Sequence, residues 1–222
     1  MMGYITHRQG QKKPTIGEIT LLGGRFVEFS YDPAARPQRI RRGVAQLKKQ
    51  GVRQAVYPQK GENLGIFPIE TLSLRRRLAA TVTLERLSAG DSVTVYGDRL
   101  SGEVEQTVEA LAQGVRYVTL CVPEGGEGLA QELRRRYGIS LRLRHRLPER
   151  AEHLLAFAPC PILWERTCCQ LYHGAEHPLP LLLPQGEQPQ CQQEQLAAAL
   201  YRQGVLSEGT LVRNAVRYLQ NP

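Results

Sequence analysis

The chain of 222 residues has no long apolar run. Its beginning, Met1 to Arg8, lacks the apolar segment that a secretory signal requires and leads into Lys12-Lys13-Pro14. The most apolar stretch lies between Pro178 and Pro184, where it is far too short to cross a bilayer and is broken by proline. We therefore expect a cytoplasmic protein that has no membrane span.

The glycine-rich phosphate-binding motifs are also absent. The chain contains no G-x-x-x-x-G-K-[ST] motif, and its glycine-containing loops at 97–102 and 124–128 do not have G-x-G-x-x-G spacing. Standard dinucleotide-binding and Walker-type NTPase functions therefore lose most of their support. Aromatic residues make up only 6% of the chain, so stacking platforms for single-stranded nucleic acid are scarce as well.

Cysteine is present in an odd number, which favours free thiols in a reducing compartment over a disulfide framework. The five residues are Cys121, Cys160, Cys168, Cys169 and Cys191. Three of them share a proline-bounded segment with His173 and His177, and thiolates and imidazoles are the ligands that zinc prefers. The paired C-x2–4-C spacing is missing because Cys168 and Cys169 are adjacent and Cys160 is remote. We assign no metal, and a Cys169–His173 nucleophile pair would need the same residues.

The charge balance is strongly basic. Lys and Arg number 29 against 21 Asp and Glu, which gives a net charge of +8 and an isoelectric point near 9.5. Such a field attracts polyanions, although scattered surface arginines produce the same balance without any partner. The triplets Arg75–Arg77 and Arg134–Arg136 each fall on an expected helix and cannot share one face, so we interpret them as solvated flanks.

Strands and helices are expected to alternate along the middle of the chain. Apolar periodicity and β-prone runs predict helices at 37–50, 70–87, 101–113 and 127–137 and strands at 54–57, 92–96, 117–122, 141–145 and 154–158. This alternation indicates βαβ units with a parallel sheet, and strand 117–122 is apolar almost throughout. Strand 141–145 alternates leucine with arginine, so it belongs near a sheet edge. A short helical turn at 148–153 leaves antiparallel pairing of strand 154–158 open.

The expected fold class is α/β: a Rossmann-like parallel sheet with alternating helices, an N-terminal β-hairpin and a C-terminal helix pair. Residues 1–15 are polar and expected to be disordered, and residues 16–158 form the α/β core, whose hairpin turns at Gly23-Gly24. Residues 159–222 supply a proline-rich loop and helices at 192–203 and 208–219, packed on the core. These two helices resemble a helix-turn-helix in outline, with Arg213 and Arg217 on the second.

A ligand site is predicted at the carboxyl ends of the parallel strands, where open α/β sheets bind their ligands. After strand 92–96 come Gly97, Asp98, Arg99 and Ser101, in a loop that opens a helix. Amides at the helix start, with Ser101 and Arg99, could hold a phosphate or carboxylate, and Asp98 could bind ribose or act as a base. The alternative is an ordinary βα turn in which Ser101 is only an N-cap.

The equivalent loop one strand later contains Gly125 and Gly126, whose exposed amides would favour an anion. Glu124 and Glu127 in the same loop would repel it. We expect a protein that binds a small anionic or nucleotide-type ligand at these two loops, with no catalytic residue or cofactor assigned. The alternatives are a non-catalytic protein that associates with nucleic acid, through weak nonspecific binding or the C-terminal helices, and a scaffold or interaction protein.

Overall fold

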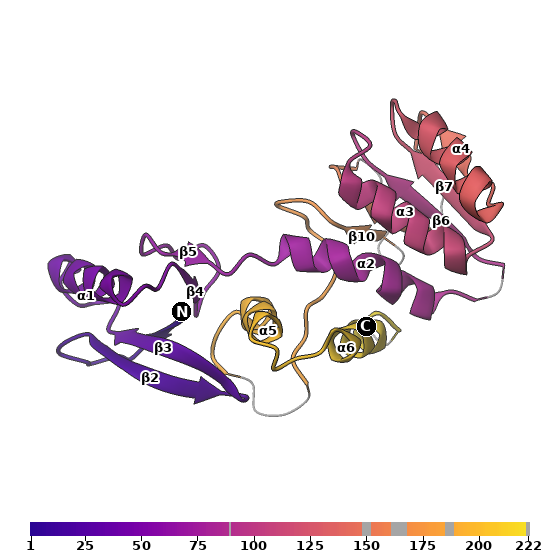
Figure 1. Cartoon of the computed structure of the whole chain (residues 1–222). Helices are drawn as coiled ribbons and strands as arrows, with labels where there is room; N and C mark the ends of the chain where they lie inside the picture. The colour runs from indigo at the N-terminus through magenta and orange to yellow at the C-terminus, as the bar shows by residue number, and fades with distance from the viewer. Residues whose placement is uncertain (89, 148–151, 161–167, 185–188, 221–222) are drawn as a thin grey trace. The chain divides into compact units, whose positions relative to one another are not determined.

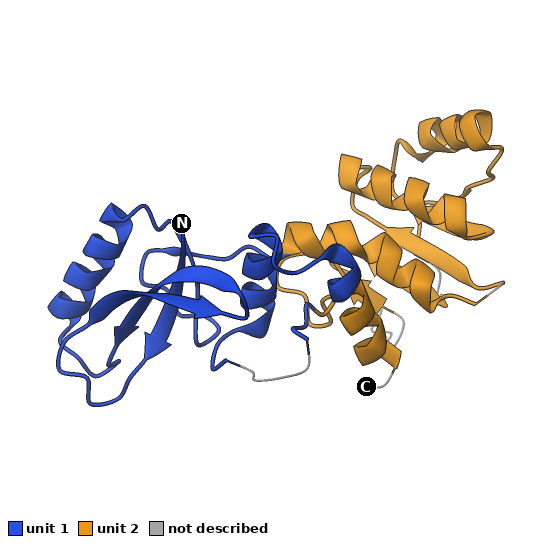
Figure 2. Ribbon diagram, turned by 60° about the horizontal axis from the view of Figure 1, so that its bottom comes forward, with its two compact units in different colours: residues 1–71, 181–211 blue, residues 72–180, 212–222 orange. Residues whose placement is uncertain are grey.

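The chain folds into two compact units, each described here by itself. The computed structural model describes residues 1–88, 90–147, 152–160, 168–184 and 189–220. Unit 1 comprises Met1–Thr71 and Leu181–Leu211, and unit 2 comprises Leu72–Pro180 and Val212–Pro222 (Figure 2). This division differs from the single core at 16–158 that the sequence suggested, because residues 1–71 have a sheet of their own.

Unit 1 is built on a five-stranded mixed sheet with the order β2-β3-β1-β4-β5 (Figure 1). Its elements are β1 (Met2–His7), β2 (Thr15–Leu21), β3 (Gly24–Tyr31), α1 (Pro37–Lys49), β4 (Gln54–Val56), β5 (Phe67–Pro68) and α5 (Gln193–Arg202). Strands β3, β1, β4 and β5 run parallel, and only β2 is antiparallel to its neighbour.

Helices cover both faces of the unit 1 sheet. Gly43 of α1 lies so close to Phe29 that a Cβ added to it would come within 2.5 Å of the ring. A Cβ added to Gly24 of β3 would likewise come within 2.4 Å of the Leu200 side chain of α5. Positions 24 and 29 differ by an odd number along β3, so α1 and α5 occupy opposite faces. The core on the α1 side includes Ile5, Phe29 and Leu47, all fully buried.

The expectation of disorder at residues 1–15 was wrong. Residues 2–7 form β1, the central strand of the unit 1 sheet, which pairs with β3 on one side and β4 on the other. Tyr4 and Ile5 are buried between the two helix layers. The polar residues around this pair lower the average hydrophobicity of residues 1–15, which is why the strand was not predicted. The hairpin of β2 and β3 is confirmed, but the residues with positive φ in its turn are Leu22 and Gly23.

Unit 2 contains a five-stranded, all-parallel sheet with the order β10-β9-β6-β7-β8. Its elements are α2 (Leu72–Arg86), β6 (Ser92–Tyr96), α3 (Gly102–Gly114), β7 (Tyr117–Cys121), α4 (Gly126–Tyr137), β8 (Arg142–Arg144), β9 (His153–Ala156), β10 (Cys168–Gln170) and α6 (Glu208–Gln220), which begins in unit 1 and continues in unit 2. The Rossmann-like α/β fold class is confirmed.

The predicted parallel trio is confirmed, with β6 beside β7, β7 beside β8, and β8 at the edge. Strand β9 pairs parallel with β6, which removes the antiparallel alternative. The helical turn expected at 148–153 falls largely outside the described residues. No helix in the described part of the chain is long and apolar enough to cross a membrane.

The two faces of the unit 2 sheet differ in chemistry. Helices α3 and α4 pack on each other and on one face of this sheet (Figure 1). A Cβ added to Gly126 of α4 would contact Leu120 and Leu143, which confirms where this helix lies. Over β6, β7 and β8 the opposite face carries polar side chains, a point developed below.

The interpretation of the first arginine triplet changes with the structure. Arg75 and Arg76 are half-buried, and their Nε atoms donate to the carbonyl oxygens of Leu179 and Leu171, each at 2.8 Å. Two residues of the first triplet therefore fix a loop of unit 2, while Arg77 is exposed. Helix α5 belongs to unit 1, and α6 begins in unit 1 and continues in unit 2, so the expected C-terminal helix pair is present.

Candidate functional site

The candidate site lies where the winding of the unit 2 sheet changes direction. From β6 the chain moves outward through β7 to β8, and it then returns to the other side of β6 to form β9 and β10. In open parallel sheets ligands bind outside the carboxyl ends of the strands at such a reversal, so we name the region between the carboxyl ends of β6 and β9 the crevice. Residues 97–101 follow β6 and residues 157–160 follow β9, so these two segments border the crevice.

The two loops singled out in the sequence adjoin each other. A Cβ placed on Gly125 would lie 3.4 Å from Cδ2 of Leu100, in ordinary van der Waals contact. The amide of Gly97 donates to the carbonyl of Cys121 across 3.1 Å, which extends the β6–β7 pairing into the loop. The structure thus brings the residues of 97–101 and 123–126 into one continuous rim beside the crevice.

Glycine is required at two points of this rim. A Cβ on Gly97 would approach the carbonyl oxygen of Arg99 to 3.0 Å, because the chain turns sharply from β6 towards α3. Gly125 has φ of 84°, a left-handed conformation that costs other residues about 1–2 kcal/mol. These glycines allow tight βα turns, and they leave backbone amides without covering side chains.

The N-termini of α3 and α4 are capped differently. The Oγ of Ser101 accepts the amide of Val104 at 3.4 Å, so the N-cap function of Ser101 is present in the structure. Helix α4 has Gly125 at its N-cap and no side-chain cap, which leaves its first-turn amides, beginning with Gly126, without a side-chain acceptor. Unpaired amides and the positive end of the helix dipole favour an anion at this place.

Charged side chains surround both loops. Asp98 and Arg99 are exposed, and within the described residues neither has a hydrogen-bond or ion-pair partner. Glu103 in the first turn of α3 pairs with Arg76, which offsets its repulsion of an anion. Glu127 in the first turn of α4 has no such pair in the described part of the chain, so it opposes an anion as the sequence suggested.

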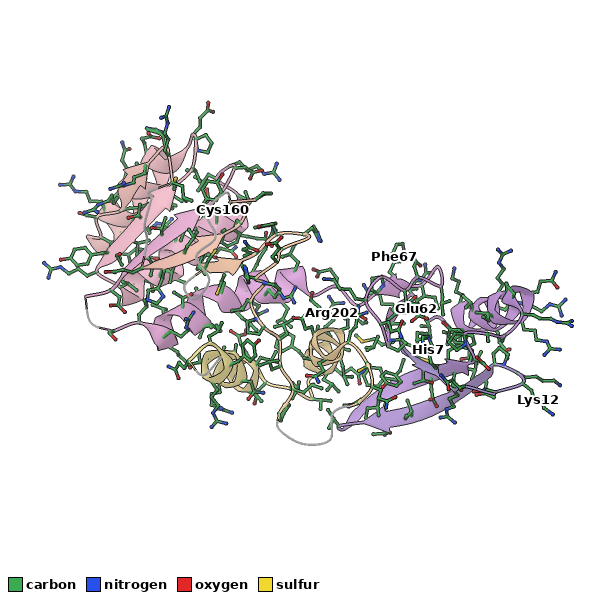
Figure 3. All side chains as sticks on the ribbon, turned by 180° about the vertical axis from the view of Figure 1, so that it is seen from behind. His7, Lys12, Glu62, Phe67, Cys160 and Arg202 are labelled. Carbon is green, nitrogen blue, oxygen red and sulfur yellow. The ribbon has the colours of Figure 1, made fainter. Side chains whose placement is uncertain are left out.

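The far side of the crevice was not recognised in the sequence. Phe157 and Ala158 are buried directly after β9, and Cys160 is half-buried (Figure 3 labels its side chain). The pKa of Tyr96 is raised by burial and by the neighbouring Cys160, Cys121 and Asp98, so its phenol stays protonated at neutral pH. This wall was missed because the partner of strand 154–158 could not be chosen from its sequence.

The cysteine and histidine residues of 160–177 do not gather into a metal site among the described residues. Cys168 and Cys169 are neighbours in β10, so their thiols point to opposite faces of the sheet. Burial raises the pKa of Cys168 to about 12 and that of Cys169 to about 11, so both remain thiols at neutral pH. His177 is exposed, and its amide donates to Oε1 of Gln170.

A second polar cluster, which the sequence did not reveal, lies at the carboxyl ends of the parallel strands of unit 1. Nε2 of His7 lies 3.1 Å from Oε1 of Glu62 and 3.2 Å from the Tyr31 hydroxyl, which donates a short hydrogen bond to the same carboxylate oxygen (Figure 3). Burial and this bond raise the pKa of Tyr31. The other oxygen of Glu62 is buried without a partner among the described residues. The sequence analysis did not predict this cluster because it did not predict β1, the strand that ends at His7.

Comparisons with known proteins assign no family. No protein-family model matches the chain, and no curated protein matches it. Among solved structures, the chain is similar to the crystal structure of L-tryptophan dehydrogenase from Nostoc punctiforme, with 17% identity and a TM-score of 0.33. The match covers 89% of this chain and 66% of that chain, so this chain spans about two thirds of the length of the dehydrogenase. A similarity of this degree carries no information about ligand or reaction.

Proposed function

We propose that unit 2 binds a small anionic, nucleotide-type ligand in the crevice between the carboxyl ends of β6 and β9. The observation that carries the proposal is the N-terminus of α4. Its first-turn amides lack a side-chain cap, and its N-cap Gly125, which follows β7, lies beside Leu100 of the β6–α3 loop that borders the crevice. A phosphate at this N-terminus would receive amide hydrogen bonds and lie at the positive end of the helix.

Side chains around the crevice suit the remaining parts of a nucleotide. Arg99 is exposed and can form a bidentate contact with a phosphate. Asp98 and Glu124 follow the ends of β6 and β7, where carboxylates can accept hydrogen bonds from ribose hydroxyls. These carboxylates favour a ligand that has both a phosphate and hydroxyl groups over a simple inorganic anion.

Equilibrium titration with a fluorescent analogue of ADP tests the proposal. We expect saturable binding to the full chain, weakened about tenfold by Arg99→Ala because one charge-assisted contact is lost. Arg135→Ala is the matched control, since Arg135 is an exposed arginine near the other end of α4, and we expect it to change affinity less than twofold. Equal losses in both variants, or no saturable binding, would contradict the proposal.

Native mass spectrometry of freshly purified protein addresses the identity of the ligand. A retained ligand adds a defined mass to the 24.9 kDa chain, and that mass identifies the ligand's chemical class. We expect a nucleotide-sized adduct that is reduced in Arg99→Ala. A retained metal ion or RNA fragment in its place would favour the alternatives raised from the sequence.

A further inference from the structure

A row of polar side chains runs from the central strand β6 of the unit 2 sheet to its edge strand β8, on the face opposite α3 and α4. Pairing places Thr94 of β6 beside Thr119 of β7, and Thr119 beside Arg142 of β8. Side chains in register on neighbouring strands share a face, and Arg144 lies on this face two residues further along β8. Strands β6, β7 and β8 therefore alternate polar and apolar residues, unlike the continuous apolar strands of most parallel sheets.

The two threonines of this row are largely buried, and their hydroxyls have no hydrogen-bond partner in the described part of the chain. Thr94 is 5% exposed and Thr119 is 8% exposed. In the described part of the chain neither hydroxyl has a hydrogen-bond partner, and both line a recess of about 750 Å³. These hydroxyl oxygens are not among the buried, unpartnered side-chain atoms of the described residues, so they open into the recess, where a ligand can bind them.

The charges that line the recess have one sign. Arg116, Arg142 and Arg144 are its charged lining residues, and no carboxylate lines it among the described residues. The guanidinium of Arg116 lies 5.3 Å from the centroid of the Tyr117 ring, which holds it at the amino end of β7. A recess that offers three guanidinium groups and two free hydroxyls supplies hydrogen-bond donors, so it suits an anion.

One carboxylate lies at the rim. Oε2 of Glu152 accepts hydrogen bonds from the amide of Ser92 at 2.6 Å and from its hydroxyl at 2.8 Å. These bonds lower the pKa of Glu152, so its charge persists at neutral pH. Ser92 is therefore occupied, and the free donors of the recess are those of the threonines and arginines.

We propose that this recess is a binding site for a phosphorylated small metabolite. Arg142 and Arg144 are two residues apart on one strand face, about 6–7 Å along β8, so two phosphate groups or one phosphate from two sides can be bound. The hydroxyls of Thr94 and Thr119, on β6 and β7, can donate further hydrogen bonds to the phosphate oxygens. The volume exceeds that of an inorganic ion, so the rest of the recess accommodates the organic part of the ligand. This site is separate from the crevice between β6 and β9.

Calorimetric titration of the full chain with pyrophosphate, at low salt, tests this site. We expect saturable binding that Arg142→Gln weakens at least tenfold and that the double variant Thr94→Val, Thr119→Val weakens about tenfold, because each change removes donors to a charged ligand. Valine retains the shape and β-branching of threonine, so both strands should keep their packing. Arg217→Gln, at an exposed arginine of α6, is the control and should change affinity less than twofold.

Three results of the titration would overturn the proposal. The first is the absence of saturable pyrophosphate binding to the unaltered chain. The second is an equal loss in Arg142→Gln and Arg217→Gln, which would indicate attraction by net charge alone. The third is unchanged affinity in the double valine variant. Backbone NMR shifts localise the ligand: we expect changes at the amides of Thr94 and Thr119, whereas changes confined to 125–128 would assign pyrophosphate to the crevice.

Discussion

Gly125 and Gly128, three residues apart at the start of α4, should respond in opposite ways to substitution by alanine. Gly125 has φ of 84°, and alanine there pays about 1–2 kcal/mol for the left-handed conformation. Its added Cβ would lie 3.4 Å from Leu100, an ordinary contact, so no further clash arises. We therefore expect Gly125→Ala to destabilise unit 2 by about 1 kcal/mol after the smaller loss of freedom in the unfolded chain is counted.

Gly128 is the matched control within the same helix. It lies inside α4 without positive φ, and an added Cβ would meet no atom within 4 Å. Alanine should therefore stabilise the helix by about 0.5–1 kcal/mol through helix propensity. The two variants should differ by about 2 kcal/mol, which corresponds to a factor of about 30 in an equilibrium constant.

Native-state hydrogen exchange of the β7 amides measures this difference within unit 2. We expect faster exchange at residues 118–121 in Gly125→Ala and slower exchange in Gly128→Ala, with the unit 1 amides as the internal reference. A change of the same sign in both variants would refute the left-handed N-cap on which the proposed anion site depends.

Further expectations concern titration, thiol reactivity and the unit 1 cluster. Burial and nearby Arg86 lower the pKa of His153 despite its contact with Asp91, so the folded state binds the proton less tightly than the unfolded state. Stability should fall as the pH drops below about 6.5, and urea unfolding should show a smaller fall in His153→Gln. Iodoacetamide at pH 7.5 should label half-buried Cys160 before Cys169, whose pKa is raised by burial; peptide mass spectrometry showing the reverse order would contradict this placement. Tyr31→Phe should destabilise unit 1 by about 1.5–3 kcal/mol, because the Glu62 carboxylate loses a donor; unchanged exchange of the β1 amides would show that the bond contributes nothing.

Local signals located most elements of unit 2 but not the organisation of the chain. The alternation of strands and helices between residues 92 and 145 predicted a parallel sheet, because βαβ units leave strong periodicity on each element. Arg142 and Arg144 correctly predicted an edge strand. The same alternation of polar and apolar residues is present in β6 and β7, where Thr94 and Thr119 indicate the polar face that lines the recess.

Long-range pairing accounts for what the sequence could not reveal. Strand β1 has only Tyr4 and Ile5 as large buried side chains, and it is stabilised by β3 and β4, which lie 24 and 52 residues away in register. Average hydrophobicity over a polar segment cannot detect such a strand. The His7 cluster was missed because β1 was missed. The residues after β9 were not assigned to the crevice because the pairing of β9 with β6 is a long-range contact that the sequence of β9 does not reveal.

Backbone NMR of the full chain titrated with ADP tests the central claim most directly. A ligand at the crevice should shift the amides of 97–102 and 125–128 in a saturable manner, with the largest changes at Gly126 and its neighbours in the first turn of α4. Gly125→Ala should weaken this response, and residues 134–136 at the other end of α4 should remain unchanged. Shifts confined to exposed arginine segments, growing without saturation and vanishing with salt, would contradict a site at the carboxyl ends of β6 and β9.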